Sequence, residues 1–261
     1  MVEKLFIECV SAIEKTILIE RANSNDKEFH FQDWINDRLH TIGDNFDAPG
    51  RNSFPDFTMV DFPLGFEVKG LAYPGRDKNY DGNSQVPKGD HNGRTIYYVF
   101  GRYPKNPDGN KYPVIDLIIC PGSFLNADSS YNHKNKSAKG FGSYGDIMIR
   151  DRKMYVIPTP FSLAEGLAHN YTLILPQENV LEKPFVCVGD LIRTECDRLL
   201  TSYHFNLVNN ELSVTTDPNP NAGRQHWFRA WRLSHQGGDT VKMRTLKEII
   251  ADLENVSDEN E

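Results

Sequence analysis

Three charged side chains near residue 60 are of types that could do chemistry if the fold brings them together. Asp56 follows a proline, and further along the chain reads Glu67-Val68-Lys69. Side chains of a strand alternate between its two faces, so Glu67 and Lys69 should share one face while Val68 points to the other. Turn-forming aspartate, proline and glycine residues separate the two segments, which predicts two short strands joined by a tight turn. In such a hairpin Asp56 can meet Glu67 and Lys69 across the strand pair.

This set of side chains suggests a particular chemistry. Carboxylates that converge need a cation between them, or one of them must stay protonated. Oxygen ligands with only one or two carboxylates suit Mg²⁺, because this ion keeps much of its water shell, and we expect Mn²⁺ to substitute for it. A lysine beside the site can orient or deprotonate the attacking water. The residues therefore predict metal-assisted hydrolysis of a phosphodiester. The competing interpretation is a surface hairpin with an ordinary Glu–Lys pair.

Net charge and its distribution limit the partners of the chain. The 261 residues carry a net charge of −7 with a pI of about 5.6, which argues against a uniformly basic surface that coats nucleic acid. The charge is uneven, because residues 251–261 hold five acidic side chains and no basic one, whereas residues 132–153 hold six basic and two acidic side chains. A local basic patch can bind DNA where the global charge does not.

The composition is that of a globular chain. Hydrophobic residues make up 39% of it, enough for a buried core. No apolar run is long enough to span a membrane, and residues 2–20 are amphipathic rather than secretory. The four cysteines show neither zinc nor disulfide spacing, so we expect a reducing cytoplasm and no membrane partner. We expect one domain over 1–261, with a catalytic core at about 1–160, an embellishing region at about 161–245 and an acidic tail at 251–261.

Hydrophobic periodicity predicts the elements around the hairpin. Apolar spacings of three and four predict core-facing helices over 2–22 and 29–39, and a final amphipathic helix over 242–253. Apolar or alternating runs predict strands over 95–100, 114–120, 171–175, 203–214 and 224–233, and a hairpin over 146–157. Residues 181–200 are ambiguous and include a possible helix over 190–200, and the polar stretch 72–94 is predicted to be a long loop. The predicted fold class is α/β (α+β): a mixed β-sheet core flanked by helices, with an additional β-rich C-terminal half.

The helices, Pro55-Asp56, the strand pair and Glu67-Val68-Lys69 together resemble the PD-(D/E)xK nuclease superfamily, whose fold most type II restriction endonucleases share. The resemblance covers residues 29–120. It implies a restriction-endonuclease-like fold in which Asp56, Glu67 and the backbone carbonyl of Val68 hold Mg²⁺. It also implies that Lys69 orients the attacking water.

Many members of this superfamily add an acidic residue from the helix before the motif. In this chain Gln32 stands near the position of the expected glutamate, which leaves the fourth ligand unassigned. Glu20, Gln32 and Asp33 are the candidates for this helix contribution.

Polar and basic segments outside the motif are candidates for DNA contacts. Short amide and hydroxyl groups can hydrogen-bond base edges, and lysine and arginine can bind phosphates. The first segment supplies Asn83, Ser84 and Gln85 for bases, and Arg76, Lys78, Lys88 and Arg94 for phosphates. A basic loop supplies Lys134, Lys136 and Lys139, and a third segment supplies Arg224, Arg229 and Arg232. For each single residue, an ordinary solvated loop is the competing interpretation.

Together these features predict a Mg²⁺-dependent, sequence-specific endonuclease of double-stranded DNA, of the type II class and part of a restriction–modification system. The resemblance implies a homodimer that cuts both strands of a two-fold symmetric target, or a monomer that nicks each strand in turn. It also implies a cognate DNA methyltransferase as functional partner. Three alternatives stay open: a repair or modification-dependent nuclease of the same fold, a DNA-binding protein without catalysis, and a globular protein in which the hairpin is accidental. The eight histidines are too scattered for a zinc site.

Overall fold

The computed structural model describes residues 1–21, 27–48, 50, 53–75, 77–82, 86–107, 109–127, 144, 148–150, 154–206, 208–209 and 211–258. The helices are α1 (Val2–Glu14), α2 (Lys27–Ile42), α3 (Gly122–Leu125), α4 (Pro160–Leu163) and α5 (Leu246–Asp258). The strands are β1 (Ile19–Glu20), β2 (Phe46–Asp47), β3 (Phe57–Met59), β4 (Leu64–Tyr73), β5 (Asn79–Asp81), β6 (Asp90–His91), β7 (Arg94–Pro104), β8 (Lys111–Tyr112), β9 (Asp116–Pro121), β10 (Met148–Arg150), β11 (Met154–Pro158), β12 (Ala164–Glu165), β13 (Tyr171–Pro176), β14 (Phe185–Thr194), β15 (Arg198–Asn206), β16 (Glu211–Pro218), β17 (Gln225–Leu233) and β18 (Lys242–Met243).

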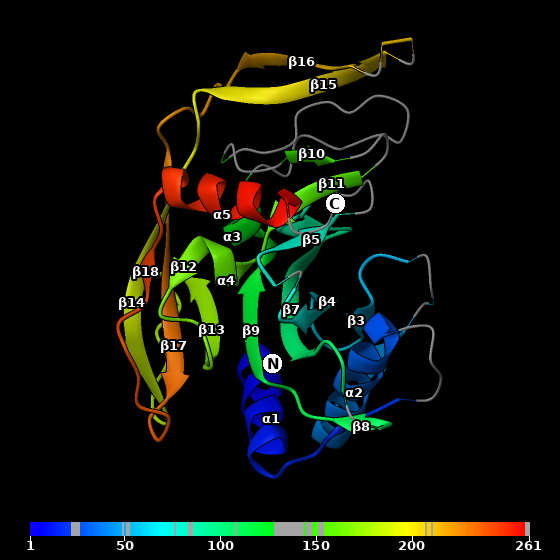
Figure 1. Ribbon diagram of the computed structural model, residues 1–261. Coiled ribbons are helices and arrows are strands. Elements are labelled where there is room, and N and C mark those ends of the chain that lie inside the picture. The colour runs from blue at the N-terminus through cyan, green and yellow to red at the C-terminus, as the bar shows by residue number, and fades with distance from the viewer. Residues whose placement is uncertain are drawn as a thin grey trace.

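One large sheet forms the centre of the molecule. Its strand order is β14-β17-β13-β9-β7-β4-β3-β2, with β6 paired to β7. β4 runs parallel to β7 and β9 runs parallel to β13, while the other neighbouring strands of this sheet are antiparallel. The sheet is therefore mixed, as the sequence predicts. Smaller strand pairs flank it, and the β15–β16 hairpin stands at the opposite end of the molecule from α1 and α2 (Figure 1).

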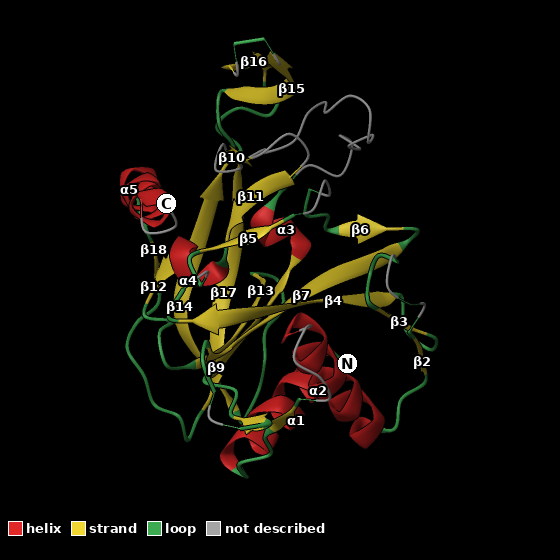
Figure 2. Ribbon diagram, turned by 45° about the vertical axis from the view of Figure 1, so that its right-hand side comes forward, coloured by secondary structure: helices red, strands yellow, loops and turns green. Residues whose placement is uncertain are grey.

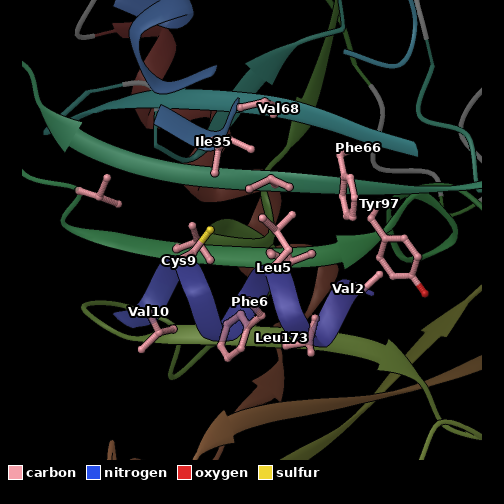
Figure 3. Close-up of a cluster of buried hydrophobic side chains, with 14 of the residues drawn as sticks. Val2, Leu5, Phe6, Cys9, Val10, Ile35, Phe66, Val68, Tyr97 and Leu173 are labelled. Atoms are coloured by element: carbon pink, nitrogen blue, oxygen red, sulfur yellow. The ribbon is translucent and has the colours of Figure 1, made fainter. Parts of the chain in front are cut away.

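Two hydrophobic clusters pack on the opposite faces of this sheet. α1 and α2 lie together on one face (Figure 2), where Phe66 and Val68 of β4 belong to the same cluster as the apolar side chains of α1 (Figure 3). Leu71 of β4 belongs to the other cluster, together with residues of α3, α4 and α5. Because strand side chains alternate, Glu67 and Lys69 point away from α1 and α2, toward the second face.

A pair of glycines fixes how α2 packs on the sheet. Gly70 of β4 and Gly101 of β7 are partners in the parallel ladder. A Cβ atom on Gly101 would lie 2.1 Å from Cζ of Phe31, and one on Gly70 would lie 3.0 Å from Cβ of Phe31. The two glycines therefore leave a notch that the aromatic ring of α2 fills, directly after Lys69 in the sequence.

Several predicted elements have other bounds or another structure. The first helix ends at Glu14 rather than at residue 22, and a turn with Thr16 at a φ of 58° leads into β1. The possible helix over 190–200 is wrong, because Phe185–Thr194 form β14, which pairs with β17 along its length. This ladder outweighs local preference. The predicted loop over 72–94 contains β5 and β6, and β5 is ordered by its pairing with β11.

The last helix also differs from the prediction. It begins at Leu246, where Thr245 and Glu248 form a capping box: the Thr245 N–H donates to the Glu248 carboxylate at 2.7 Å, and the Glu248 N–H donates to the Thr245 hydroxyl at 3.4 Å. The helix then runs through Asp258, into the predicted acidic tail. The structure confirms the predicted helix over 29–39 and the strands over 95–100, 114–120, 171–175 and 224–233 as α2, β7, β9, β13 and β17. It also confirms the hairpin over 146–157 as β10 and β11.

Candidate active site

Asp56 and Glu67 come together because of the register of the hairpin. β3 pairs with β4 through Phe57 with Phe66 and Thr58 with Gly65. Asp56 directly precedes β3, so the same register places it opposite Glu67. Its carboxylate Oδ2 accepts a hydrogen bond of 2.7 Å from the backbone N–H of Val68, the residue after Glu67. The first carboxylate of the predicted site is therefore fixed to the backbone of the strand that carries the second.

A close contact between Pro55 and Gly65 holds this end of the hairpin. A Cβ atom on Gly65 would lie 2.5 Å from Cγ of the proline ring. Only glycine at this position allows the buried ring of Pro55 to lie directly on β4. This contact thereby fixes the position of the next residue, Asp56, relative to β4.

Glu67 and Lys69 form an ion pair on the second face of the sheet. Nζ of Lys69 lies 2.8 Å from Oε1 of Glu67, and the two side chains are 18% and 12% exposed, respectively. The second carboxylate oxygen, Oε2 of Glu67, is buried without a hydrogen-bond partner among the described residues. Burying a charged oxygen without a partner is costly, so this atom favours a further cation or donor beside it.

The backbone of Val68 supplies a third oxygen on the same side. Its side chain is buried in the α1–α2 cluster, with 3% of its surface exposed. In an extended strand the N–H and C=O groups of one residue point to the same edge. Since the N–H of Val68 points to Asp56, its carbonyl oxygen points to that edge of β4 as well.

These oxygen atoms suit Mg²⁺ better than a metal ion that takes all its ligands from the protein. Within the described part of the chain, no group of three or more His, Cys, Asp or Glu side chains could hold a metal ion. Two carboxylates and one carbonyl are few ligands, and Mg²⁺ accepts such a set because it retains several waters. The buried, unpartnered Oε2 of Glu67 is the atom that supports this fit most directly.

Tyr98 borders both carboxylates and was missed at the level of sequence. It is the ladder partner of Glu67 on β7 and is 3% exposed. Burial, then the charge of Glu67, and to a smaller extent that of Asp56, raise the pKa of Tyr98 well above its usual value. Its hydroxyl group accepts a 3.4 Å hydrogen bond from the N–H of Lys88. The phenol of Tyr98 is therefore bonded to residue 88 and stands in the same row of the sheet as Glu67, a position that only the β4–β7 pairing reveals.

A small cavity adjoins the lysine. It has a volume of about 200 Å³ and is lined by Lys69 and the residues that follow it on β4, by Tyr103, and by Asn79, Tyr80 and Asp81 of β5. Asp81 is thus a further carboxylate that shares a cavity with Lys69. The sequence shows Asp81 only as part of a polar stretch, because its position depends on the pairing of β5 with β11.

The three candidates for the helix contribution lie on α2 and on β1. Gln32 and Asp33 belong to α2, which covers the face of the sheet opposite to the one that Glu67 and Lys69 face. Burial raises the pKa of Asp33, and the charges that act on it are those of His30 and Asp37 on the same helix. Glu20 lies on β1 rather than on a helix, and its carboxylate forms an ion pair with Lys111.

The predicted DNA contacts fall into different settings. The guanidinium of Arg94 donates to the carbonyl oxygens of Met59 and Phe62 at 2.7 and 3.0 Å, so it closes the β3–β4 turn. Nζ of Lys78 lies 3.7 Å from Oδ1 of Asp252, and Nε of Arg229 lies 3.2 Å from Oδ1 of Asp190. The predicted contact through Arg232 is wrong, because this side chain is fully buried and donates to the Thr172 hydroxyl group at 3.2 Å.

Two further candidates keep accessible surface. Lys88 is half-buried beside Tyr98, and Arg224 is exposed in the turn before β17. The other candidates lie outside the described residues: Arg76, Asn83, Ser84, Gln85, Lys134, Lys136 and Lys139.

Comparison with known proteins gave no relative. No protein-family model matches the chain, and neither the curated proteins nor the solved structures contain a match. Of the helices in the described ranges, none is both long and apolar enough to cross a membrane.

Proposed function

We propose that the protein is a Mg²⁺-dependent endonuclease that hydrolyses phosphodiester bonds in double-stranded DNA, with a restriction-endonuclease-like site of the PD-(D/E)xK type. One observation carries the proposal: the carboxylate of Asp56 is hydrogen-bonded to the backbone of Val68, the residue between Glu67 and Lys69. Oε2 of this Glu67 has no hydrogen-bond partner among the described residues. Buried polar atoms are normally hydrogen-bonded, so an accidental surface hairpin does not explain a buried carboxylate oxygen without a partner.

Each residue has a definite task in this proposal. Asp56, Glu67 and the carbonyl of Val68 would hold Mg²⁺, and the ion would supply charge stabilisation to the phosphate in the transition state. Lys69, positioned by its ion pair with Glu67, would orient the attacking water toward the phosphorus atom through its ammonium group. Tyr98 stays neutral at this site and closes it from the side of β7.

The expected substrate and partners follow from the same resemblance. We propose a type II restriction enzyme that acts as a homodimer in the cytoplasm on a short symmetric sequence, with a cognate DNA methyltransferase that protects the host sites. The β-rich residues 161–245 would supply sequence recognition. A modification-dependent nuclease of the same fold and a DNA-binding protein without catalysis are the outcomes against which the proposal is tested.

The test is plasmid cleavage by the purified protein. Unmethylated plasmid with Mg²⁺ should give discrete fragments, and EDTA should abolish them. Lys69→Met should lower the rate by at least about 100-fold, the typical scale of losing a group that orients the reacting atoms. Lys111→Met, which removes an exposed lysine paired with Glu20, is the matched control and should cut like the wild type.

Each alternative gives a different result. Fragments from methylated plasmid only would support the modification-dependent nuclease. DNA binding without cleavage in Mg²⁺ or Mn²⁺ would leave the non-catalytic binding protein. Wild-type cleavage by Lys69→Met would remove the site assignment even if the protein is a nuclease.

A further inference from the structure

A large open cavity lies at one end of β13 and β17. Its volume is about 720 Å³, which is within the range of small-ligand sites. Among the residues that line it are Gln177, Glu178, Gln225, His226, Trp227 and Arg229. Trp227 is 42% exposed, although a tryptophan of a core strand is usually buried. The cavity therefore combines an accessible aromatic face with amide, carboxylate and imidazole groups.

One wall of this cavity is a built polar network. Oε1 of the buried Glu195 lies 2.8 Å from Nε2 of His226, and Oε2 of Glu195 accepts a hydrogen bond of 3.1 Å from the amide of Asn219. Glu195 is 4% exposed. The ring of Tyr144 meets that of His226 edge-on, with centroids 5.9 Å apart. The imidazole is thus held from two sides, as in a site that orients a ligand.

The cavity and the carboxylates lie toward the same end of the sheet. One row of paired residues crosses five strands, from Val68 through Val99, Ile119 and Leu173 to Trp231. Four inter-strand steps of about 4.8 Å separate its ends by about 19 Å. Trp227 lies four residues before Trp231 on β17 and, by strand alternation, on the α1 face, whereas Glu67 faces the other side of the sheet. DNA at the carboxylates therefore reaches Trp227 around this end of the sheet.

The short helix α3 packs between the candidate active site and the cavity. Gly122 and Ser123 belong to α3, and Ser123 lines the cavity. A Cβ atom on Gly122 would lie 1.9 Å from the carbonyl oxygen of Lys88, and one on Gly89 would lie 3.2 Å from Cβ of Ser123. α3 therefore packs directly between the segment that borders Tyr98 and the cavity.

We propose that this cavity receives a single unpaired nucleobase of the DNA substrate, stacked on Trp227; the choice of DNA as its source rests on the proposed function. The carboxylate of Glu178 repels a phosphate, and the guanidinium of Arg229 is already paired with Asp190 at 3.2 Å. The Glu178 carboxylate accepts hydrogen bonds from the amino groups of a base. Gln177 and Gln225 can pair with ring nitrogens and carbonyl groups. A base within a duplex exposes only its edges, whereas a concave site with an aromatic wall accepts a base taken out of the stack.

Deoxynucleosides are the probes, titrated into metal-free protein while tryptophan fluorescence is followed. The other two tryptophans, Trp34 and Trp231, are 3% and 5% exposed, so quenching reports mainly on Trp227. We expect saturable quenching with a preference for one base. Trp227→Ala should weaken binding, read by displacement of a labelled nucleoside, by about 5- to 150-fold, and Trp227→Phe should retain most of it.

Two results would overturn the proposal. One is the absence of saturable quenching by any deoxynucleoside up to about millimolar concentration, because stacking and hydrogen bonding should give at least this affinity. The other is competition by inorganic phosphate, which would identify an anion site. Glu67→Gln separates this cavity from the nuclease site: it should bind nucleosides like the wild type while its cleavage is lost. Nucleoside binding by a wild-type protein that cuts no DNA would retain the cavity and reject the nuclease.

Discussion

The carboxylate of Asp56 accepts a hydrogen bond of 2.7 Å from the backbone N–H of Val68, across the open end of the β3–β4 hairpin. β3 begins at Phe57, so no further ladder pairing of β3 satisfies this N–H group. Asp56 therefore combines two roles. It completes the backbone hydrogen bonding of β4, and it places a carboxylate beside Glu67.

Substitution of Asp56 separates these roles. In Asp56→Asn the amide oxygen still accepts the Val68 N–H, so the free energy of unfolding should stay within about 0.5 kcal/mol of the wild type. Asp56→Ala leaves the N–H unpaired and should cost about 1–3 kcal/mol. Both variants should lose DNA cleavage by at least about 100-fold. Urea unfolding and plasmid cleavage measure the two effects. Equal stability of the two variants would show that the hydrogen bond does not contribute.

Mg²⁺ should stabilise the folded protein through Glu67. Among the described residues no donor partners the buried Oε2 of Glu67, and binding of a cation there links metal concentration to folding. At a free Mg²⁺ concentration of about 100 times Kd, the free energy of unfolding should rise by about 2.7 kcal/mol. Thermal unfolding with increasing Mg²⁺ measures this, and Glu67→Gln should abolish the dependence. Glu165→Gln, at an exposed glutamate paired with Lys242, is the control and should retain it. An equal rise of Tm in wild type and Glu67→Gln would argue against a metal at Glu67.

The sequence predicts the hairpin because its signals are local. Alternation places Glu67 and Lys69 on one face, and turn residues join the strands within a few positions. Tyr98 and Asp81 reach the site through pairing between distant strands, which no local pattern reports. The same cause explains the error at residues 190–200, since the β14–β17 ladder decides that segment.

The exposed face of Trp227 was also not predicted. In the sequence Trp227 and Trp231 lie four residues apart in an aromatic strand, so both fall on one face, which is typical of core positions. Trp231 is 5% exposed and packs in the α1 cluster, but Trp227 lies beyond that cluster and is 42% exposed. The two residues differ in exposure because α1 covers the sheet at Trp231 and not at Trp227. This difference is a property of the packed molecule.

Overpacking should destabilise the junction between α2 and the sheet. In Gly101→Ala the new methyl group would meet the ring of Phe31, which is fully buried and stacked on Trp34 with centroids 6.0 Å apart. We expect a loss of about 1–3 kcal/mol in the free energy of unfolding. Phe31→Leu in the Gly101→Ala background should recover part of it, whereas Phe31→Leu alone should leave a cavity and destabilise. Additive losses in the double-mutant cycle would contradict the contact.

The stability of the protein should fall in mild acid because of His91. Burial, and then the positive charge of Lys88, lower the pKa of His91 from its usual 6.5, and its ring packs edge-on against Phe54 with centroids 5.1 Å apart. Between the lowered pKa and 6.5, the unfolded chain binds a proton that the folded chain does not bind. The free energy of unfolding therefore decreases as the pH falls below 6.5 and is fully retained above it.

His91→Asn removes this proton and should flatten the decrease between about pH 7 and pH 5, measured by urea unfolding at several pH values. His235→Asn is the matched control, because His235 is exposed and lies 2.6 Å from Glu14 rather than beside a lysine. It should not flatten the decrease as His91→Asn does. If His91→Asn loses as much stability in acid as the wild type, burial and the charge of Lys88 do not lower the pKa of His91 in the folded protein.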